Sequence, residues 1–191
     1  MKSLSLSKPH VIIMVGVPGA GKSFFAERFS QTFSAPLVSW KAIRDELFND
    51  PVYTKDEDDI VERGALRMLA ELLKTGATIV YESDIQSQVH RQSIAKIAKG
   101  AEYEALLVWS QVDNTTAKSR AVKSGLTPQQ YARYESSFTP PKQKDSLVVI
   151  SGKHTYASQL KIVLTKLVGP RVDHREVKAR QRPAGTNILV R

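Results

Sequence analysis

The 191-residue sequence contains no cysteine, which excludes disulfide bonds, thiolate metal sites and cysteine nucleophiles. It has no apolar run approaching the roughly 20 residues that cross a bilayer, so we expect no membrane partner. The first ten residues lack the long apolar stretch of a secretory signal, and we therefore expect a cytoplasmic protein. Hydrophobic residues still make up 41% of the chain, which is enough for a compact core and too many for a disordered chain.

Acidic residues are scarce relative to basic ones: 19 Asp and Glu stand against 28 Lys and Arg, giving a formal net charge of +9. This balance favours phosphate-rich partners, either an anionic small molecule or nucleic acid. The apolar periodicity stops after Gly169-Pro170, where a basic segment begins. We therefore expect a domain over residues 1–168 and a basic tail over residues 169–191 that is disordered or binds a partner. The oligomeric state stays open.

Strand and helix patterns alternate along the chain, which predicts an α/β fold with a parallel sheet of about five strands flanked by helices. The predicted strands cover residues 10–15, 36–39, 77–82, 103–109 and 147–150. The predicted helices cover residues 22–33, 42–48, 56–74, 88–99, 114–123, 128–134 and 156–167. We interpret the acidic run Asp56–Asp59 as a solvated first helical turn that complements the helix dipole, and not as a metal site.

The first predicted strand runs into a glycine-rich loop with the spacing G-x-x-x-x-G-K-S, and a predicted helix follows. We expect this loop and the next residue to bind a nucleoside triphosphate: Gly16, Val17, Pro18, Gly19, Ala20, Gly21, Lys22, Ser23 and Phe24. Glycines allow the backbone N–H groups to surround an anion, and the helix N-terminus adds partial positive charge. Lys22 can reach the β- and γ-phosphates, and the Ser23 hydroxyl can bind Mg²⁺. The motif therefore predicts ATP and Mg²⁺ as ligands within a P-loop NTPase fold.

Two carboxylates follow the strand predicted over residues 77–82. Glu82 ends that strand and Asp84 lies two residues later. A carboxylate at this edge of a parallel sheet, beside a phosphate loop, can hold Mg²⁺ or activate a nucleophile. Glu82 is the better candidate for the metal, and either residue could be catalytic. Asp84 could instead cap the following turn.

Three basic residues are candidates for contact with phosphate. Arg44 follows the second predicted strand and could hold a substrate phosphate with its planar guanidinium, or could pair with acidic neighbours on its own helix. Lys41 is a second cation near the same edge. Arg120 lies on a short predicted helix and could close over the transferring phosphate as part of a helical lid, or could simply be solvated.

The order of these features resembles a family of small P-loop kinases that includes the kinase domain of polynucleotide kinase, the zeta toxins and AAA-like predicted kinases. The resemblance covers roughly residues 10–167 and depends on four segments: VIIMVGVPGAGKSFFAERF, residues 38–44, residues 78–91 and residues 106–123. It implies that Arg44 binds a substrate phosphate and that Arg120 is the lid arginine. The chain departs from the family at Lys41, where the family usually has an aspartate that acts as general base; Asp45 or Asp84 could replace it.

The leading hypothesis is an ATP-dependent phosphotransferase that moves the γ-phosphate of Mg·ATP to a hydroxyl acceptor, such as a nucleotide or the 5′-hydroxyl of a polynucleotide. In this hypothesis Lys22, Arg44, Glu82, Asp84 and Arg120 carry catalysis. The alternative is a nucleotide-binding switch, pseudokinase or plain NTPase, with a basic tail that binds nucleic acid or protein. Lys41 is the main support for this alternative, because a protonated lysine cannot accept a proton from an acceptor hydroxyl.

Overall fold

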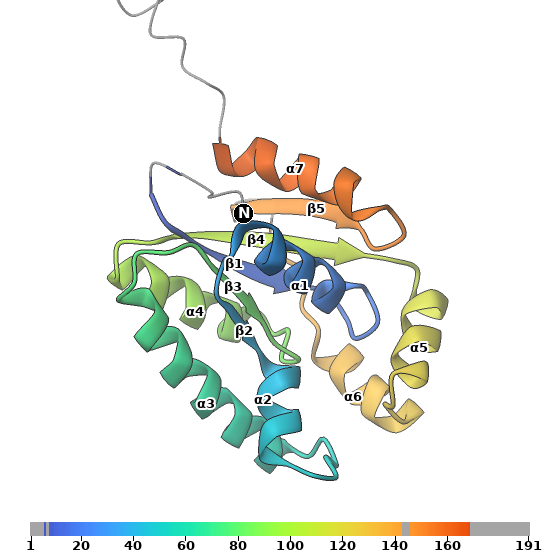
Figure 1. Ribbon diagram of the computed structural model, residues 1–191. Coiled ribbons are helices and arrows are strands. Elements are labelled where there is room, and N and C mark those ends of the chain that lie inside the picture. Colours follow the sequence, from blue (N-terminus) through green and yellow to red (C-terminus); the bar gives the residue numbers. More distant parts are fainter. Residues whose placement is uncertain (1–5, 7, 143–145, 169–191) are drawn as a thin grey trace, which may run out of the picture.

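The computed structural model describes residues 6, 8–142 and 146–168 (Figure 1). Its strands are β1 (His10–Val15), β2 (Leu37–Ser39), β3 (Ile79–Glu82), β4 (Glu104–Gln111) and β5 (Leu147–Ser151). Its helices are α1 (Lys22–Phe33), α2 (Trp40–Leu47), α3 (Lys55–Leu73), α4 (Gln88–Gly100), α5 (Asn114–Lys123), α6 (Pro128–Ser137) and α7 (Tyr156–Val168). The predicted basic tail, residues 169–191, lies outside the described residues.

The five strands form one parallel sheet in the order β2-β3-β1-β4-β5, which confirms the predicted α/β fold. Strand β1 is central: Val11 pairs with Ile79 of β3 and with Ala105 of β4. All strands of a parallel sheet end at the same edge, and a ligand crevice forms there between neighbouring strands. The loop after β1 therefore lies between the segments that follow β3 on one side and β4 on the other.

Both faces of the sheet are covered, so all six residues of β1 are buried. Alternate residues of a strand point to opposite faces. Val11 and Ile13 pack with residues of α3 and α4, whereas Ile12 and Met14 pack with residues of α1 and α7. Figure 1 draws α7 above β5, α1 in front of the strands, and α3 and α4 toward the lower left of the view. This double covering explains why β1 is a continuous apolar run in the sequence.

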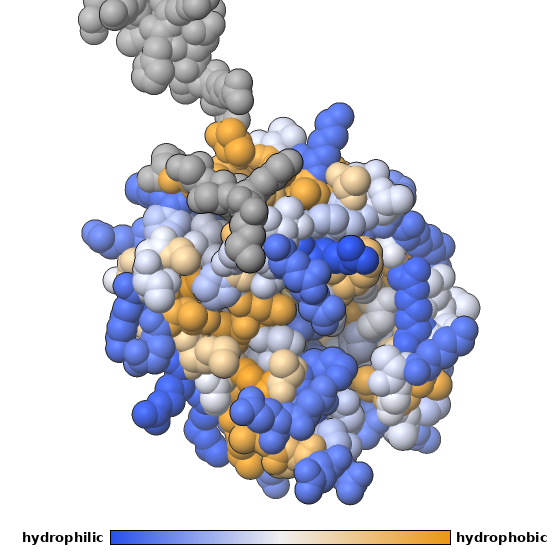
Figure 2. Space-filling view, viewed as in Figure 1, coloured by the Kyte–Doolittle hydropathy of each residue, from blue (hydrophilic) through white to orange (hydrophobic). Residues whose placement is uncertain are grey.

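The predicted elements agree closely with the structure, and the differences are at their ends. Helix α2 begins at Trp40 because the Ser39 side chain caps it, accepting a hydrogen bond of 3.3 Å from the Ala42 N–H. Helix α6 continues to Ser137, and β4 continues to Gln111, which pairs with Ser151 of β5. In the described part of the chain, no helix has the length and apolar character that a bilayer span requires. Hydrophilic and hydrophobic residues are interspersed on the face shown in Figure 2.

Helices α5 and α6 form the predicted short lid. Tyr131 of α6 is buried against Ala117 and Ala121 of α5, and its hydroxyl donates a hydrogen bond of 2.5 Å to Asn114 Oδ1. Val17 of the glycine-rich loop packs against the same small cluster. The lid thus contacts the glycine-rich loop directly.

Candidate functional site

Position 19 of the glycine-rich loop requires glycine for two reasons. Its φ of +77° lies in the left-handed region that side chains disfavour. In addition, a methyl group at Gly19 would lie 2.1 Å from the carbonyl oxygen of Ala117 in α5. At Gly16 a methyl group would lie 2.6 Å from the carbonyl oxygen of Ser110 in β4. The close approach that the sequence indicated at these positions therefore includes the protein's own backbone.

Lys22 is the cation of this loop, and its side chain folds back over it. Lys22 Nζ donates hydrogen bonds to the carbonyl oxygens of Gly16 at 2.9 Å and Val17 at 3.3 Å. Burial lowers the pKa of Lys22 below its ordinary value, and the charges of Glu82 and Asp84 oppose that shift. A buried ammonium group is stabilised by neighbouring negative charge. The negative charge of a bound triphosphate would serve this purpose in the loop.

The end of β3 brings together oxygen ligands suitable for Mg²⁺. Ser23 Oγ donates a hydrogen bond of 2.8 Å to Glu82 Oε1, and Ser39 Oγ donates one of 3.1 Å to Glu82 Oε2. Neighbouring ligands of an octahedral Mg²⁺ at its usual bond lengths are about 2.9 Å apart. The Ser23 and Glu82 oxygens are therefore already spaced to share the ion. Within the described residues, no group of three or more His, Cys, Asp or Glu side chains is arranged to hold a metal ion.

Asp84 faces the same region and does not cap a helix. Helix α4 is capped instead by Ser87, whose side chain accepts from the His90 N–H. Asp84 Oδ2 lies 3.6 Å from Arg44 Nη2. Burial, followed by the negative charge of Glu82, raises the pKa of Asp84 to about 6, although Lys22 and Arg44 act in the opposite direction. Asp84 is thus a partly buried carboxylate close to the phosphate loop.

These groups surround one cavity of about 650 Å³, here called the phosphate cavity. Its walls include nine of the residues predicted from the sequence: Pro18, Gly19, Gly21, Lys22, Ser23, Phe24, Glu82, Asp84 and Arg120. Because β1 is central, the segments after β2 and β3 form one side of this cavity and those after β4 and β5 form the other. The first side, which we call the acceptor side, contributes Lys41, Tyr53 and Asp84. The second contributes Arg120, whose Nη1 donates a hydrogen bond of 3.0 Å to the carbonyl oxygen of Gly152.

Arg44 lies elsewhere, buried beneath the acceptor side, and does not line the phosphate cavity. Its exposed fraction is 0%; Nη1 pairs with Glu57 Oε2 at 3.0 Å and Nη2 with Asp58 Oδ1 at 2.6 Å. The interpretation of Asp56–Asp59 as a solvated turn was therefore wrong for Glu57 and Asp58, which are buried. Asp58 also accepts hydrogen bonds from Arg133 and Tyr134, so this cluster connects α2, α3 and the lid helix α6.

Lys41, which stands where the family resemblance led us to expect an acid, lines the phosphate cavity and is largely exposed. It forms an ion pair with Asp45 one helical turn later. The hydrogen bond between the Lys41 amine and the Asp45 carboxylate raises the pKa of Lys41 above its ordinary value. The amine therefore stays protonated and cannot act as a base. Asp45 does not line the phosphate cavity, whereas Asp84 does.

Three residues that the sequence did not single out support the loop. Ser39 contacts Glu82 as described above. The sequence signal that could have indicated Ser39 was its position between a predicted strand and a predicted helix. Gln86 is buried, and its Oε1 accepts a hydrogen bond of 3.2 Å from the Gly16 N–H. Gly152 follows β5 and contacts the backbone of Ala20. The last two contacts join segments far apart in sequence, so local patterns could not reveal them.

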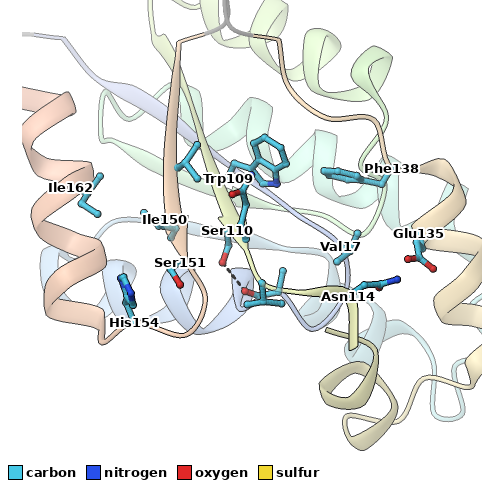
Figure 3. A pocket seen from close by; sticks show the side chains of 14 residues that line it. Val17, Trp109, Ser110, Asn114, Glu135, Phe138, Ile150, Ser151, His154 and Ile162 are labelled. Atoms are coloured by element: carbon cyan, nitrogen blue, oxygen red, sulfur yellow. Dashed lines mark hydrogen bonds between the residues drawn. The ribbon is translucent and has the colours of Figure 1, made fainter. Parts of the chain in front are cut away.

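A second cavity of about 730 Å³ lies beside the carboxyl ends of β4 and β5 (Figure 3). Val17 and Ala20 of the glycine-rich loop line it, with Trp109 and Phe138 among its apolar walls. The Ser110 hydroxyl donates a hydrogen bond of 2.7 Å to the Ala20 carbonyl oxygen, drawn as a dashed line in Figure 3. Strand β4 thus fixes the backbone of the loop from this side.

Gly152→Ala tests the contact between the loop after β5 and the glycine-rich loop. A methyl group at Gly152 would lie 2.0 Å from the Ala20 carbonyl oxygen, so one backbone segment must move. We expect a loss of about 1–3 kcal/mol in the free energy of unfolding, together with weaker ATP binding. Urea unfolding and titration with ATP measure the two effects.

Gly100→Ala is the matched control, because nothing lies within 4 Å of a methyl group there and Gly100 is helical. It should leave ATP binding unchanged and stabilise the protein by at most about 1 kcal/mol. Equal ATP affinities for the two variants would show that the contact between Gly152 and Ala20 does not support nucleotide binding.

A parallel sheet with a glycine-rich loop, Lys22 and Ser23 at the N-terminus of α1, and Glu82 at the end of β3 defines a P-loop nucleotide-binding domain with a small kinase-like fold. The sequence family described as an AAA domain matches residues 11–140, which is more than half of the chain. The protein belongs to this family. No curated protein matches the sequence.

Solved structures support the fold. A gluconokinase from Sinorhizobium meliloti 1021 is 18% identical with a TM-score of 0.59, covering 91% of this chain and 98% of its own. The APS kinase of Mycobacterium tuberculosis, in complex with AMPPNP and APS, is 15% identical with a TM-score of 0.63, covering 85% and 99%. A sugar kinase from Janibacter sp. HTCC2649 is 15% identical with a TM-score of 0.60, covering 85% and 96%. At these identities the likeness concerns the fold.

Proposed function

We propose that this protein is an ATP-dependent phosphotransferase that moves the γ-phosphate of Mg·ATP to a hydroxyl group of an acceptor. The observation that carries the proposal is the presence of Lys22, Glu82 and Asp84 in one cavity, with Asp84 on the acceptor side. The cavity of about 650 Å³ would hold the phosphates of ATP at the glycine-rich loop and the acceptor beside Asp84. The similarity to structures described as kinases supports the same function.

The triphosphate would bind the backbone N–H groups of the glycine-rich loop, with Lys22 on its β- and γ-phosphates. Ser23 and Glu82 would hold Mg²⁺, which neutralises charge on the phosphate oxygens. Arg120 lines the phosphate cavity from the lid helix α5 and would stabilise the charge that develops on the transferring group. Because the lid packs against Val17, closure of the lid would move the phosphate loop directly.

Asp84 would act as the general base. The acceptor oxygen forms a bond to the γ-phosphorus, the bond from this phosphorus to the bridging β–γ oxygen breaks, and ADP leaves. The hydroxyl proton passes to an Asp84 carboxylate oxygen. Asp84 thereby replaces the acid that the family usually has at the position of Lys41. Its ion-pair contact with Arg44 Nη2 at 3.6 Å would orient it.

The variant Asp84→Asn tests this role. We expect its rate of phosphate transfer to fall by about 10²–10⁴-fold, because an amide cannot accept the proton. The measurement uses labelled ATP, Mg²⁺ and a panel of acceptors that includes sugars, nucleosides and 5′-hydroxyl oligonucleotides. Asp59→Asn is the control, since Asp59 is an exposed residue of α3 that lines neither cavity, and its rate should not change.

Two outcomes would contradict the proposal at different points. An unchanged rate in Asp84→Asn would exclude Asp84 as the base and leave the transfer activity intact. Tight binding of ATP by the wild type without transfer to any acceptor would contradict the phosphotransferase itself. That second result would favour the alternative of a nucleotide-binding switch, and hydrolysis alone would indicate a plain NTPase.

A further inference from the structure

The charge on Arg44 is already neutralised inside the protein. Its two terminal nitrogens pair with Glu57 Oε2 at 3.0 Å and with Asp58 Oδ1 at 2.6 Å. Asp84 Oδ2 adds a third carboxylate at 3.6 Å from Nη2. A guanidinium recognises phosphate or carboxylate with two parallel N–H groups. In Arg44 the terminal N–H groups that would provide this fork face protein carboxylates.

Tyr53 also separates Arg44 from the phosphate cavity. Its ring centroid lies 4.7 Å from Arg44 Cζ, and Tyr53 lines the cavity whereas Arg44 does not. Tyr53 has a φ of +56°, a conformation that costs a non-glycine residue about 1–3 kcal/mol. Glu57 holds it there by accepting hydrogen bonds from the Tyr53 N–H at 2.7 Å and the Val52 N–H at 2.9 Å. The same carboxylate thus neutralises Arg44 and fixes the ring over it.

The remaining charge on the acceptor side is negative. Asp84, Glu82 and Glu27 line the phosphate cavity, and the cation Lys41 is paired with Asp45. Lys22 is engaged by the phosphate loop, and Mg²⁺ would offset Glu82. A second anion placed beside Asp84 would meet a like charge, because Arg44 is shared with Glu57 and Asp58 and offsets Asp84 only in part. Hydroxyl groups, in contrast, can donate hydrogen bonds to these carboxylates, and the Tyr53 ring offers an apolar surface.

Building on the proposed function, we infer that the acceptor is an uncharged, polyhydroxylated ring compound, such as a free sugar or a nucleoside, and not a phosphorylated or carboxylated one. Its hydroxyl groups bind the carboxylates of the acceptor side, and its ring packs beside Tyr53. This inference replaces the anionic acceptor that Arg44 suggested from the sequence.

Matched pairs of acceptors test the inference with the full-length protein. Each pair differs in one carboxylate and keeps every sugar hydroxyl group: phenyl glucoside with 4-carboxyphenyl glucoside, phenyl riboside with 4-carboxyphenyl riboside, and uridine with 5-carboxyuridine. With labelled ATP and Mg²⁺, we expect the uncharged member to accept phosphate at least about tenfold faster, given the like charge of Asp84. The sugar pairs and the nucleoside pair distinguish the two sources of such a ring. Equal or faster transfer to the anionic members would overturn the inference while leaving the phosphotransferase intact.

Inorganic phosphate is a second probe that does not require transfer. With the phosphate loop occupied by Mg·AMPPNP, the wild type should bind added phosphate with a dissociation constant above about 1 mM. In Asp84→Asn the like charge is removed, and phosphate should bind at least about tenfold more tightly. Asp59→Asn, which removes an exposed carboxylate of α3 that lines neither cavity, should match the wild type. Micromolar phosphate binding by the loaded wild type would overturn the inference, even if no acceptor is found. If phosphate is rejected but nothing accepts label, the charge inference stands and the proposed function fails.

Discussion

Replacing Arg44 with methionine is expected to lower the free energy of unfolding by about 3–5 kcal/mol, because it leaves the buried carboxylate of Glu57 without its cation and removes one of the two cations of Asp58, which keeps Arg133. Both side chains are less than 10% exposed, so water cannot replace the lost partner. A typical domain is stable by only about 5–15 kcal/mol, and the variant should therefore unfold at a clearly lower urea concentration. Equilibrium urea unfolding measures this change.

Lys41→Met provides the control on the same helix. Its charge is removed from an exposed pair with Asp45, whose side chains are 59% and 47% exposed. Exposed ion pairs contribute about 0–1 kcal/mol, so this variant should unfold close to the wild-type midpoint. A small, equal effect of both substitutions would show that the cluster around Arg44 is not a structural centre. It would also reopen the interpretation of Arg44 as a ligand of substrate phosphate.

Replacing Lys22 with methionine should strongly reduce activity. We expect the rate of phosphate transfer at saturating Mg·ATP to fall by about 10²–10³-fold, because a buried charge that stabilises the phosphate oxygens is lost. Stability should change little or rise, because Lys22 is buried and loses only hydrogen bonds to the carbonyl oxygens of Gly16 and Val17. Initial rates with labelled ATP test the first expectation, and urea unfolding tests the second.

Lys166→Met is the matched control for Lys22, since Lys166 is an exposed lysine near the end of α7 and lines neither the phosphate cavity nor the second cavity. Its transfer rate should equal that of the wild type. A Lys22→Met protein that remains folded and retains full activity would exclude the assigned role of the lysine. If Lys22→Met fails to fold, the milder Lys22→Arg, which keeps the charge but changes its shape, should fold and still transfer slowly.

The secondary structure followed from the sequence because its signals are local. Helix α1 occupies the predicted residues, since apolar spacing and the glycine loop before it are properties of a few adjacent positions. The position of the glycine-rich loop beside the end of β3 does not follow from local signals. It was expected from a rule for parallel sheets, whose strands all end at the same edge. The contact between Ser23 and Glu82, 59 residues apart, is consistent with that expectation.

The charges on the acceptor side were harder to predict. Arg44 was a candidate phosphate ligand because it follows the second predicted strand and has a planar guanidinium, and the family resemblance supported that role. Its partners Glu57 and Asp58 lie 13 and 14 residues away on another helix, and they meet it only when α2 and α3 pack together. A single acidic run can be solvated or buried, and burial depends on what covers it.

The sequence by itself therefore determined the P-loop, the parallel α/β fold and the set of chemically capable residues, because each depends on spacing within a segment. The tertiary structure decided which of these residues reach the phosphate cavity. In the folded protein Arg44 is buried, Asp84 lines the phosphate cavity, and Gly152 contacts Ala20. The physical reason is that the charge state and accessibility of a side chain depend on neighbours from other segments, which only the folded chain brings together.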